Sequence, residues 1–307
     1  MPGQPQNKIL VVRGGAIGDF ILTLPALAAL RQQFPNSSLE VLGYAHIAQL
    51  ALAGRLVDDV RSIEARTLAG FFARRGELDQ ALQQYFAEFA VIISYLYDPD
   101  GIFQENIARC AKAQFIQALH RPDESAALHA SRVFLQPLER LAIFDADPVP
   151  RLQVAAQASA RPSLAVHPGS GSEKKNWPEA KWLEMLQSLL NEPQRTIVLV
   201  GGEAEEGRLE RLASALAPPK GRVEIARSLP LPELASRLAG CQAFVGHDSG
   251  ITHLAAALGL PVLALWGDTC AEVWRPLGDH VRLVRASEGL PRLRVEIVLN
   301  EIQKLIS

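Results

Sequence analysis

Short runs of aliphatic and β-branched residues alternate along this chain with longer stretches whose apolar positions recur at helical spacing. The first run, Lys8–Arg13, predicts a buried strand, and Asp19–Gln33 predicts a helix that ends just before Pro35. The same pattern predicts further strands at Leu39–Gly43 and Ala90–Ser94. The stretch 57–88 is ambiguous, and we interpret it as a strand followed by a polar helix.

The segment Asp145–Pro162 interrupts this alternation with three prolines and an Ala/Gln-rich filler. The alternation then restarts. It predicts strands at Ser163–His167, Thr196–Val200, Val223–Ile225, Ala243–Val245 and Val262–Leu265, and helices at Pro178–Leu190 and Glu203–Ala217 and from Leu231 and Gly250.

Strands that alternate with helices indicate a parallel sheet with right-handed crossovers. We therefore predict an α/β protein of two Rossmann-like, doubly wound domains, 1–150 and 151–307, facing across a cleft in the GT-B arrangement. The extreme C-terminal helix is a candidate for packing back on the first domain. In such sheets ligands bind at the carboxyl ends of the strands, so we expect the chemistry in the loops that follow strands.

The loop after the first strand contains Gly14, Gly15 and Gly18 and leads into Asp19. It does not fit a dinucleotide fingerprint, because Arg13 stands at the place of the first glycine and Glu40 precedes the body of the second strand. Asp19 has two compatible interpretations, an N-cap of the helix and a carboxylate base facing a cleft.

The loop after the first strand of the second domain carries small residues, hydroxyls and two lysines. Ser170, Ser172, Lys174 and Lys175 are suited to holding a diphosphate, and Pro178 sets the start of the next helix. A solvated surface loop is the equally weighted alternative.

A third loop precedes the helix predicted from Gly250. Amides at Ser249 and Gly250 would point from the helix start toward an anion. Asp248 would repel phosphate, and it fits better as a ligand of sugar hydroxyls or as a cap. His253 is as consistent with a packed histidine as with a ligand contact.

Composition narrows the class of protein. The chain has 48% hydrophobic and 21% charged residues and a net charge of −2, which gives no electrostatic reason to expect nucleic-acid binding. Its three cysteines form no disulfide or metal pattern, and the two D-x-D matches at 98–100 and 145–147 lie in a turn and in the linker. We expect no metal and no cofactor. No apolar run could span a membrane and no signal peptide precedes the first strand, so we expect a cytoplasmic protein.

Three segments together resemble the lipopolysaccharide heptosyltransferase family. They are ILVVRGGAIGDFILTLPAL, HPGSGSEKKNWPEAKW and GHDSGITHLAAALGLPVLALWGDT, and the resemblance covers roughly residues 8–50 and 163–275. It implies an inverting glycosyltransferase whose donor, usually ADP-heptose, binds the second domain. The acceptor, a lipopolysaccharide-core sugar, would bind the first domain, and its lipid would bring the enzyme to the inner-membrane surface.

The resemblance also implies roles for residues. Asp19 matches the catalytic base, Lys175 a lysine at the donor phosphates, and Asp248 an aspartate at the donor sugar. Ser170, Ser249, Gly250 and His253 match neighbouring donor-binding positions, and Glu206 matches a glutamate at the ribose. Lys174 and Glu205 remain alternatives in register to Lys175 and Glu206. Other functions left open are transfer of a different sugar on the same fold, a catalytically silent nucleotide-sugar-binding module and, with less support, a Rossmann oxidoreductase.

Overall fold

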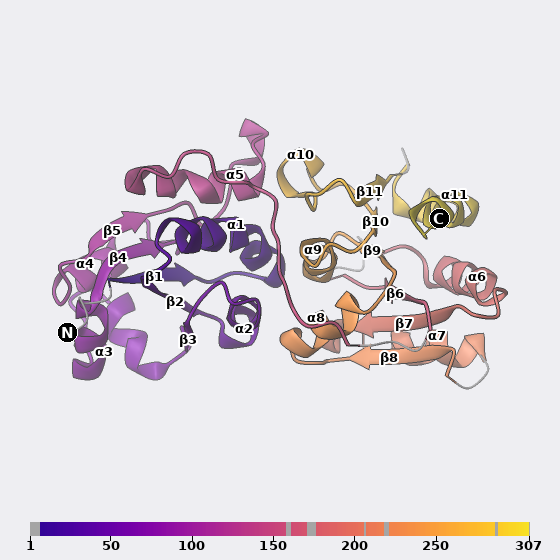
Figure 1. The fold of residues 1–307 in the computed structure, drawn as a ribbon, viewed down its shortest axis with the longest axis horizontal. Coiled ribbons are helices and arrows are strands. Elements are labelled where there is room, and N and C mark those ends of the chain that lie inside the picture. Colours follow the sequence, from indigo (N-terminus) through magenta and orange to yellow (C-terminus); the bar gives the residue numbers. More distant parts are fainter. Residues whose placement is uncertain are drawn as a thin grey trace. The chain divides into compact units, whose positions relative to one another are not determined.

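The computed structural model describes residues 7–157, 161–170, 176–205, 207–217, 221–285 and 288–306. The chain forms two compact units, Met1–Pro150 and Arg151–Ser307 (Figure 1). Each unit is built on its own parallel sheet, as the alternating pattern of the sequence predicts. The Rossmann-like class of both units is therefore confirmed.

The sheet of the first unit has the strand order β3-β2-β1-β4-β5, and every pair is parallel. The strands are β1 (Lys8–Arg13), β2 (Ser38–Gly43), β3 (Asp59–Ser62), β4 (Phe89–Ser94) and β5 (Gln114–Gln117). The central strands β1 and β4 have apolar interiors, ILVV and AVII, because both faces of the sheet are covered.

Helices cover the two faces of this first sheet. They are α1 (Ile17–Gln33), α2 (Ala45–Ala53), η1 (Arg66–Phe72), α3 (Gln80–Ala87), α4 (Ile102–Ala108), η2 (Glu124–Ala126), α5 (Ala130–Leu135) and η3 (Gln136–Leu141). One face of the sheet packs against η1, α3 and α4 through a cluster that includes Leu10, Phe71 and Phe86. Helices α1 and α5 pack together elsewhere in the same unit.

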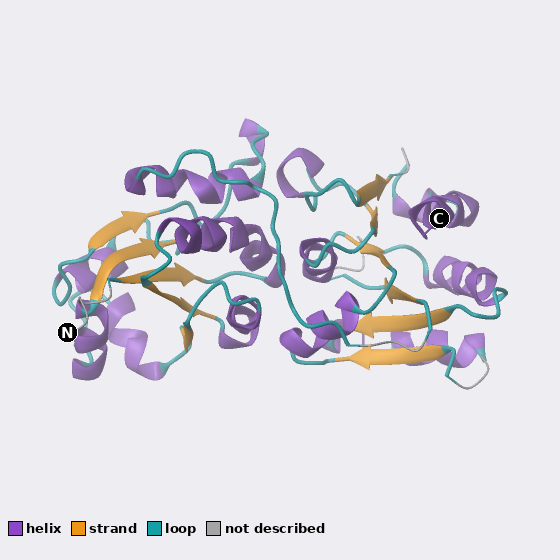
Figure 2. Cartoon of the chain, in the orientation of Figure 1, coloured by secondary structure: helices purple, strands orange, loops and turns teal. Residues whose placement is uncertain are grey.

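The ambiguous stretch after β3 differs from the prediction. It forms the short 3-10 helix η1 and then α3, in place of one polar helix (Figure 2). Its course is fixed by the buried Asn106 on α4, whose side-chain amide lies 2.9–3.3 Å from the main-chain carbonyl oxygens of Gly70, Phe71 and Ala73. Arg109 extends the contact to the carbonyl of Gly76. This stretch is therefore held by contacts to main-chain atoms, which propensity does not report.

The sheet of the second unit has the order β11-β10-β9-β6-β7-β8, again parallel throughout. The strands are β6 (Ser163–His167), β7 (Thr196–Gly201), β8 (Val223–Arg227), β9 (Ala243–His247), β10 (Val262–Leu265) and β11 (Val281–Val284). This is the order of a six-stranded Rossmann sheet, in which the direction of winding reverses between β6 and β9. A ligand site is expected at the carboxyl ends of those two strands.

The helices of the second unit are α6 (Glu179–Leu190), η5 (Glu203–Glu205), α7 (Arg208–Leu216), α8 (Leu231–Ala239), α9 (Gly250–Ala257), α10 (Ala271–Trp274), η6 (Leu290–Arg292) and α11 (Val295–Ile306). The helix predicted at Glu203–Ala217 is divided into η5 and α7. The C-terminal helix α11 buries Val298 and Ile302 in the core of the second unit.

Two strands escaped the prediction, β5 and β11. Both lie at the edge of a sheet, and both have short sequences, QFIQ and VRLV, in which polar and apolar residues mix. Edge strands are only partly covered, so their sequences lack the continuous apolar run that identifies a buried strand. In the described part of the chain, no helix combines the length and apolar character needed to cross a membrane.

Candidate functional site

In the first unit, the predicted residues gather where β1 leads into α1. The helix begins at Ile17 after Ala16 as N-cap, so Asp19 is its third residue and is not itself the N-cap. The Asp19 carboxylate reaches back to accept a hydrogen bond from the Ala16 N–H at 3.0 Å. Its side chain is 30% exposed and remains accessible for chemistry.

Gly15 makes room for that carboxylate. Its φ is +99°, and a Cβ atom at this position would lie 2.9 Å from Asp19 Oδ2. Gly14 precedes it in the loop, and Gly18 lies in the first turn of α1. The glycines of this loop therefore shape the backbone around Asp19.

Arg13 ends β1 as a buried cation directly beside Asp19. Its guanidinium donates to the carbonyls of His120 at 3.0 Å and Asp19 at 3.3 Å, and it lies 3.9 Å from the Asp19 carboxylate. The guanidinium also contacts the rings of Phe134 and Tyr95, with the Phe134 centroid at 4.4 Å. Burial lowers the pKa of Arg13, and the charge of Asp19 opposes that shift.

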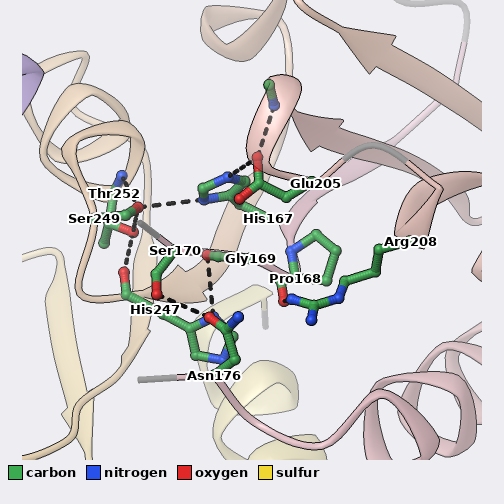
Figure 3. Close-up of polar contacts among 11 residues, drawn as sticks. His167, Pro168, Gly169, Ser170, Asn176, Glu205, Arg208, His247, Ser249 and Thr252 are labelled. Atoms are coloured by element: carbon green, nitrogen blue, oxygen red, sulfur yellow. Dashed lines mark hydrogen bonds and ion pairs between the residues drawn. The ribbon is translucent and has the colours of Figure 1, made fainter. Parts of the chain in front are cut away.

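In the second unit, two histidines end adjacent strands. His167 is the last residue of β6 and His247 the last of β9, and both are buried (Figure 3). Because β6 and β9 are parallel neighbours, both imidazoles reach the same edge of the sheet. Sequence reasoning assigned neither a role, although a histidine at the end of an apolar strand was a visible signal.

His247 fixes both ends of the loop that follows β6. Its Nε2 accepts from the Trp177 N–H at 2.7 Å, so Nδ1 carries the proton and donates to the Gly169 carbonyl at 3.2 Å. Burial lowers the pKa of His247 to about 4, although the bond to Gly169 works in the opposite direction. The imidazole is therefore neutral at pH 7, and it joins the two residues that bracket the glycine- and lysine-bearing segment.

His167 contacts two residues named from the sequence, Ser249 and Glu205. Its Nδ1 lies 3.2 Å from the hydroxyl oxygen of Ser249, and its Nε2 lies 3.7 Å from the carboxylate of Glu205. Burial alone would raise the pKa of Glu205. The hydrogen bonds from His167 and the Gly202 N–H, with the charges of His167 and Arg208, outweigh burial and hold that pKa below its ordinary value.

Glu205 packs tightly into a space left by two glycines. A Cβ atom at Gly169 would lie 2.2 Å from Glu205 Cγ, and one at Gly201 would lie 2.8 Å from Glu205 Cβ. A side chain at Gly169 therefore cannot coexist with Glu205 in this position. Of the two glutamates considered from sequence, Glu205 belongs to this cluster, and Glu206 lies outside the described residues.

The residues predicted to hold phosphate are described in part. Ser170 is buried, and its hydroxyl donates to the side-chain oxygen of Asn176 at 2.8 Å. Lys174 and Lys175 lie outside the described residues. Arg208, which the sequence did not single out, donates to the Pro168 carbonyl at 3.2 Å and adds a cation to this edge of the sheet.

The third loop forms the N-terminus of α9. Ser249 is the N-cap, and its hydroxyl oxygen accepts from the Thr252 N–H. The cap therefore directs the first-turn amides, Gly250 included, toward the edge of the sheet. The carboxylate of Asp248 accepts from the Thr269 hydroxyl at 2.6 Å, and His253 is buried within α9.

This edge combines a glycine-bearing loop, a helix N-terminus and a buried carboxylate. The first two supply amide donors for an anion, and a carboxylate suits hydroxyl groups. No group of three or more metal-ligating side chains occurs within the described ranges. In the first D-x-D match, Asp98 accepts from the Phe103 and Gln104 N–H groups at the start of α4. The arrangement is typical of a site for a phosphorylated sugar or nucleotide.

Comparison with known proteins gives a consistent result. The model of glycosyltransferase family 9 (heptosyltransferase) matches residues 137–302. Lipooligosaccharide heptosyltransferase 2 of Haemophilus influenzae is 25% identical over 313 residues, covering 92% of this chain and 89% of that protein. Lipopolysaccharide heptosyltransferase 1 of Pseudomonas aeruginosa is 26% identical over 287 residues, covering 85% and 79%.

Comparison with solved structures leads to the same group of proteins. The structure of ADP-heptose lipopolysaccharide heptosyltransferase II of E. coli superposes with a TM-score of 0.79 at 19% identity, and the match covers 97% of this chain and 98% of that one. At this identity the likeness concerns the fold. It supports the GT-B class, because both Rossmann-like units are included in the match.

The buried state of His247 predicts a pH dependence of stability. Its pKa is about 4 in the folded protein against 6.5 ordinarily. Between those values the unfolded chain binds a proton that the folded chain does not, so stability falls as pH drops from 6.5 to 4, by up to about 1.4 kcal/mol per pH unit. A His247→Gln variant should lack this contribution.

Urea unfolding followed by tryptophan fluorescence measures the effect, because all four tryptophans lie in the second unit. The quantity to compare is the difference in unfolding free energy between the two proteins at each pH. Parallel profiles from pH 4 to pH 8 would contradict a buried neutral imidazole.

The contact between Gly169 and Glu205 predicts a coupled pair. Gly169→Ala should destabilise the second unit by about 1–3 kcal/mol through overpacking. In a Glu205→Ala background the atoms that it meets are gone, so the same change should cost less. The matched control is Gly202→Ala, whose Cβ would lie 3.8 Å from its nearest neighbour, a Glu205 oxygen. Equal costs in both backgrounds would refute the coupling.

Proposed function

The chain belongs to glycosyltransferase family 9, the heptosyltransferases, whose model matches more than half of its length, and from this premise we propose that it transfers a heptose from ADP-heptose to a lipopolysaccharide-core sugar. The observation that carries the proposal is the edge where β6 and β9 end. This edge combines the loop that His247 bonds at both ends with the N-terminus of α9, which Ser249 caps.

The donor binds the second unit in this proposal. Its diphosphate would lie against the loop that begins at Gly169 and the first turn of α9, where Ser170, Lys175 and the amides at Ser249 and Gly250 would balance its charge. The carboxylate of Asp248 would accept hydrogen bonds from heptose hydroxyls. His253 on α9 would also contribute to donor binding. Glu205 or Glu206 would bind the ribose.

The first unit supplies the base. Asp19 would take the proton of an acceptor hydroxyl while that oxygen forms a bond to the anomeric carbon of the heptose. The bond from this carbon to the phosphate oxygen breaks, and its electron pair leaves with ADP. A single displacement inverts the anomeric centre. The Arg13 guanidinium lies 3.9 Å from this carboxylate.

The acceptor also suggests where the reaction occurs. A lipopolysaccharide precursor is anchored by its lipid, so the enzyme would work in the cytoplasm at the surface of the inner membrane. Its contact with that surface would be peripheral and would last as long as the acceptor is bound.

Purified protein should release ADP and transfer heptose from ADP-heptose to lipopolysaccharide that lacks heptose, with inversion at the anomeric carbon. UDP-, GDP- and CDP-sugars should give little thermal stabilisation compared with ADP-heptose, since only a ligand of the folded state raises the melting midpoint. If a different nucleotide sugar stabilises the protein more than ADP-heptose does, that sugar is the donor. Stabilisation by ADP-heptose without transfer would indicate a binding module.

Asp19→Asn should lower kcat by roughly 10²–10⁴-fold, the usual effect of losing a general base, while ADP-heptose binding stays near the wild-type value. Asp145→Asn is the matched control, because Asp145 is an exposed aspartate of the same unit that lies outside its helices and strands. If Asp19→Asn turned over at the wild-type rate, Asp19 would not be the base. Its role would then be limited to the hydrogen bond with Ala16.

A further inference from the structure

An exposed aromatic pair lies at the carboxyl edge of the first sheet. Tyr97 follows β4 and is 72% exposed, and His120 follows β5 and is also exposed. Their ring centroids are 4.7 Å apart with planes inclined at 60°. Two exposed rings from separate loops thus support each other, although neither is part of the apolar core.

The pair is connected to the segment where β1 leads into α1, which carries Asp19. Strands β1, β4 and β5 are consecutive parallel neighbours, so the loops after them emerge at one edge. The His120 carbonyl accepts a hydrogen bond from Arg13, the same guanidinium that bonds the Asp19 carbonyl. On the other side, a Cβ at Gly14 would lie 3.7 Å from Leu96, the residue before Tyr97.

The side chain of Gln117 links the two loops that carry the rings. The side-chain amide of Gln117 donates to the carbonyls of Ser94 and Leu96 after β4, at 3.2 and 3.0 Å. It also contacts the Ala118 carbonyl at 3.1 Å, in the loop that leads to His120. A pre-ordered surface loses little conformational entropy when a ligand covers it, which favours binding.

We propose that Tyr97 and His120 form a platform on which a sugar ring of the acceptor stacks, an inference that rests on the proposed function. A sugar ring has an apolar C–H face and a polar rim. The exposed tyrosine ring offers a flat apolar surface for the first, and its hydroxyl and the His120 imidazole offer hydrogen bonds to the second. The position beside Asp19 brings the ring that carries the reacting hydroxyl to the base.

The chemistry favours a sugar over an acyl chain. A lipid needs a continuous apolar surface, whereas the exposed pair is one tyrosine and one histidine, with Leu119, 56% exposed, next to His120 in the chain. Both rings of the pair carry polar groups at their rims. Such a mixture of flat ring and hydrogen-bonding atoms matches the two sides of a pyranose.

The test is the acceptor dependence of transfer from ADP-heptose to heptose-deficient lipopolysaccharide. Tyr97→Ala should raise the acceptor KM roughly 5- to 10-fold, the range expected for one aromatic contact, and leave the ADP-heptose KM unchanged. Tyr97→Phe keeps the ring and should stay near wild type, and His120→Ala should have a smaller effect than Tyr97→Ala. Leu52→Ala, an exposed residue near the end of α2, is the control and should change nothing.

A second acceptor distinguishes the sugar from the lipid. With the lipid-free oligosaccharide of the same lipopolysaccharide, Tyr97→Ala should show the same rise in KM. An effect seen only with the intact glycolipid, or an unchanged acceptor KM in Tyr97→Ala, overturns the platform. Calorimetry of the lipid-free oligosaccharide with wild type and Tyr97→Ala makes the comparison without turnover. Absence of transfer by the wild-type enzyme would thus count against the proposed function, and equal binding by both proteins against the platform.

Discussion

A neutral imidazole inside the second unit determines the shape of the candidate donor site. The ring nitrogens of His247 join the main chain at Gly169 to the main chain at Trp177, and these residues lie on the two sides of the segment that carries the lysines. Both bonds need an uncharged ring, with one nitrogen as donor and the other as acceptor. Burial maintains that state, because a charged imidazole would lose its hydration at this depth.

The first unit meets the same physical problem with a different group. At the end of β1 the buried guanidinium of Arg13 joins the carbonyl of His120, in the loop after β5, to that of Asp19, in the first turn of α1, and it contacts two aromatic rings. In both units a polar side chain at the end of a central strand thus bonds main-chain atoms of the loops around it. Main-chain atoms at the candidate sites, that of Gly169 among them, are thereby held in one position, which a binding site requires.

Much of the fold and part of the candidate site could be predicted from the sequence. The central strands were identified because they are covered on both faces and are therefore continuously apolar. The edge strands β5 and β11 were not, and neither was the course of the chain from β3 to α3, because side-chain contacts to distant main chain decide it. For the same reason the sequence did not reveal the roles of His167 and His247. Glycines, Asp19 and strand-end histidines stand out in a sequence, whereas a bond from His247 to a carbonyl 78 residues away does not.

The contact between Asn106 and the stretch after β3 has a consequence for how such a protein can diversify. Asn106 bonds only main-chain carbonyls there, and these are present whatever the side chains are. Exposed side chains of that stretch, that of Arg74 among them, can therefore be exchanged without altering its path. A lineage could in this way replace the chemistry that one surface presents while inheriting its backbone intact. Sequence similarity would decay there first, and shape would persist.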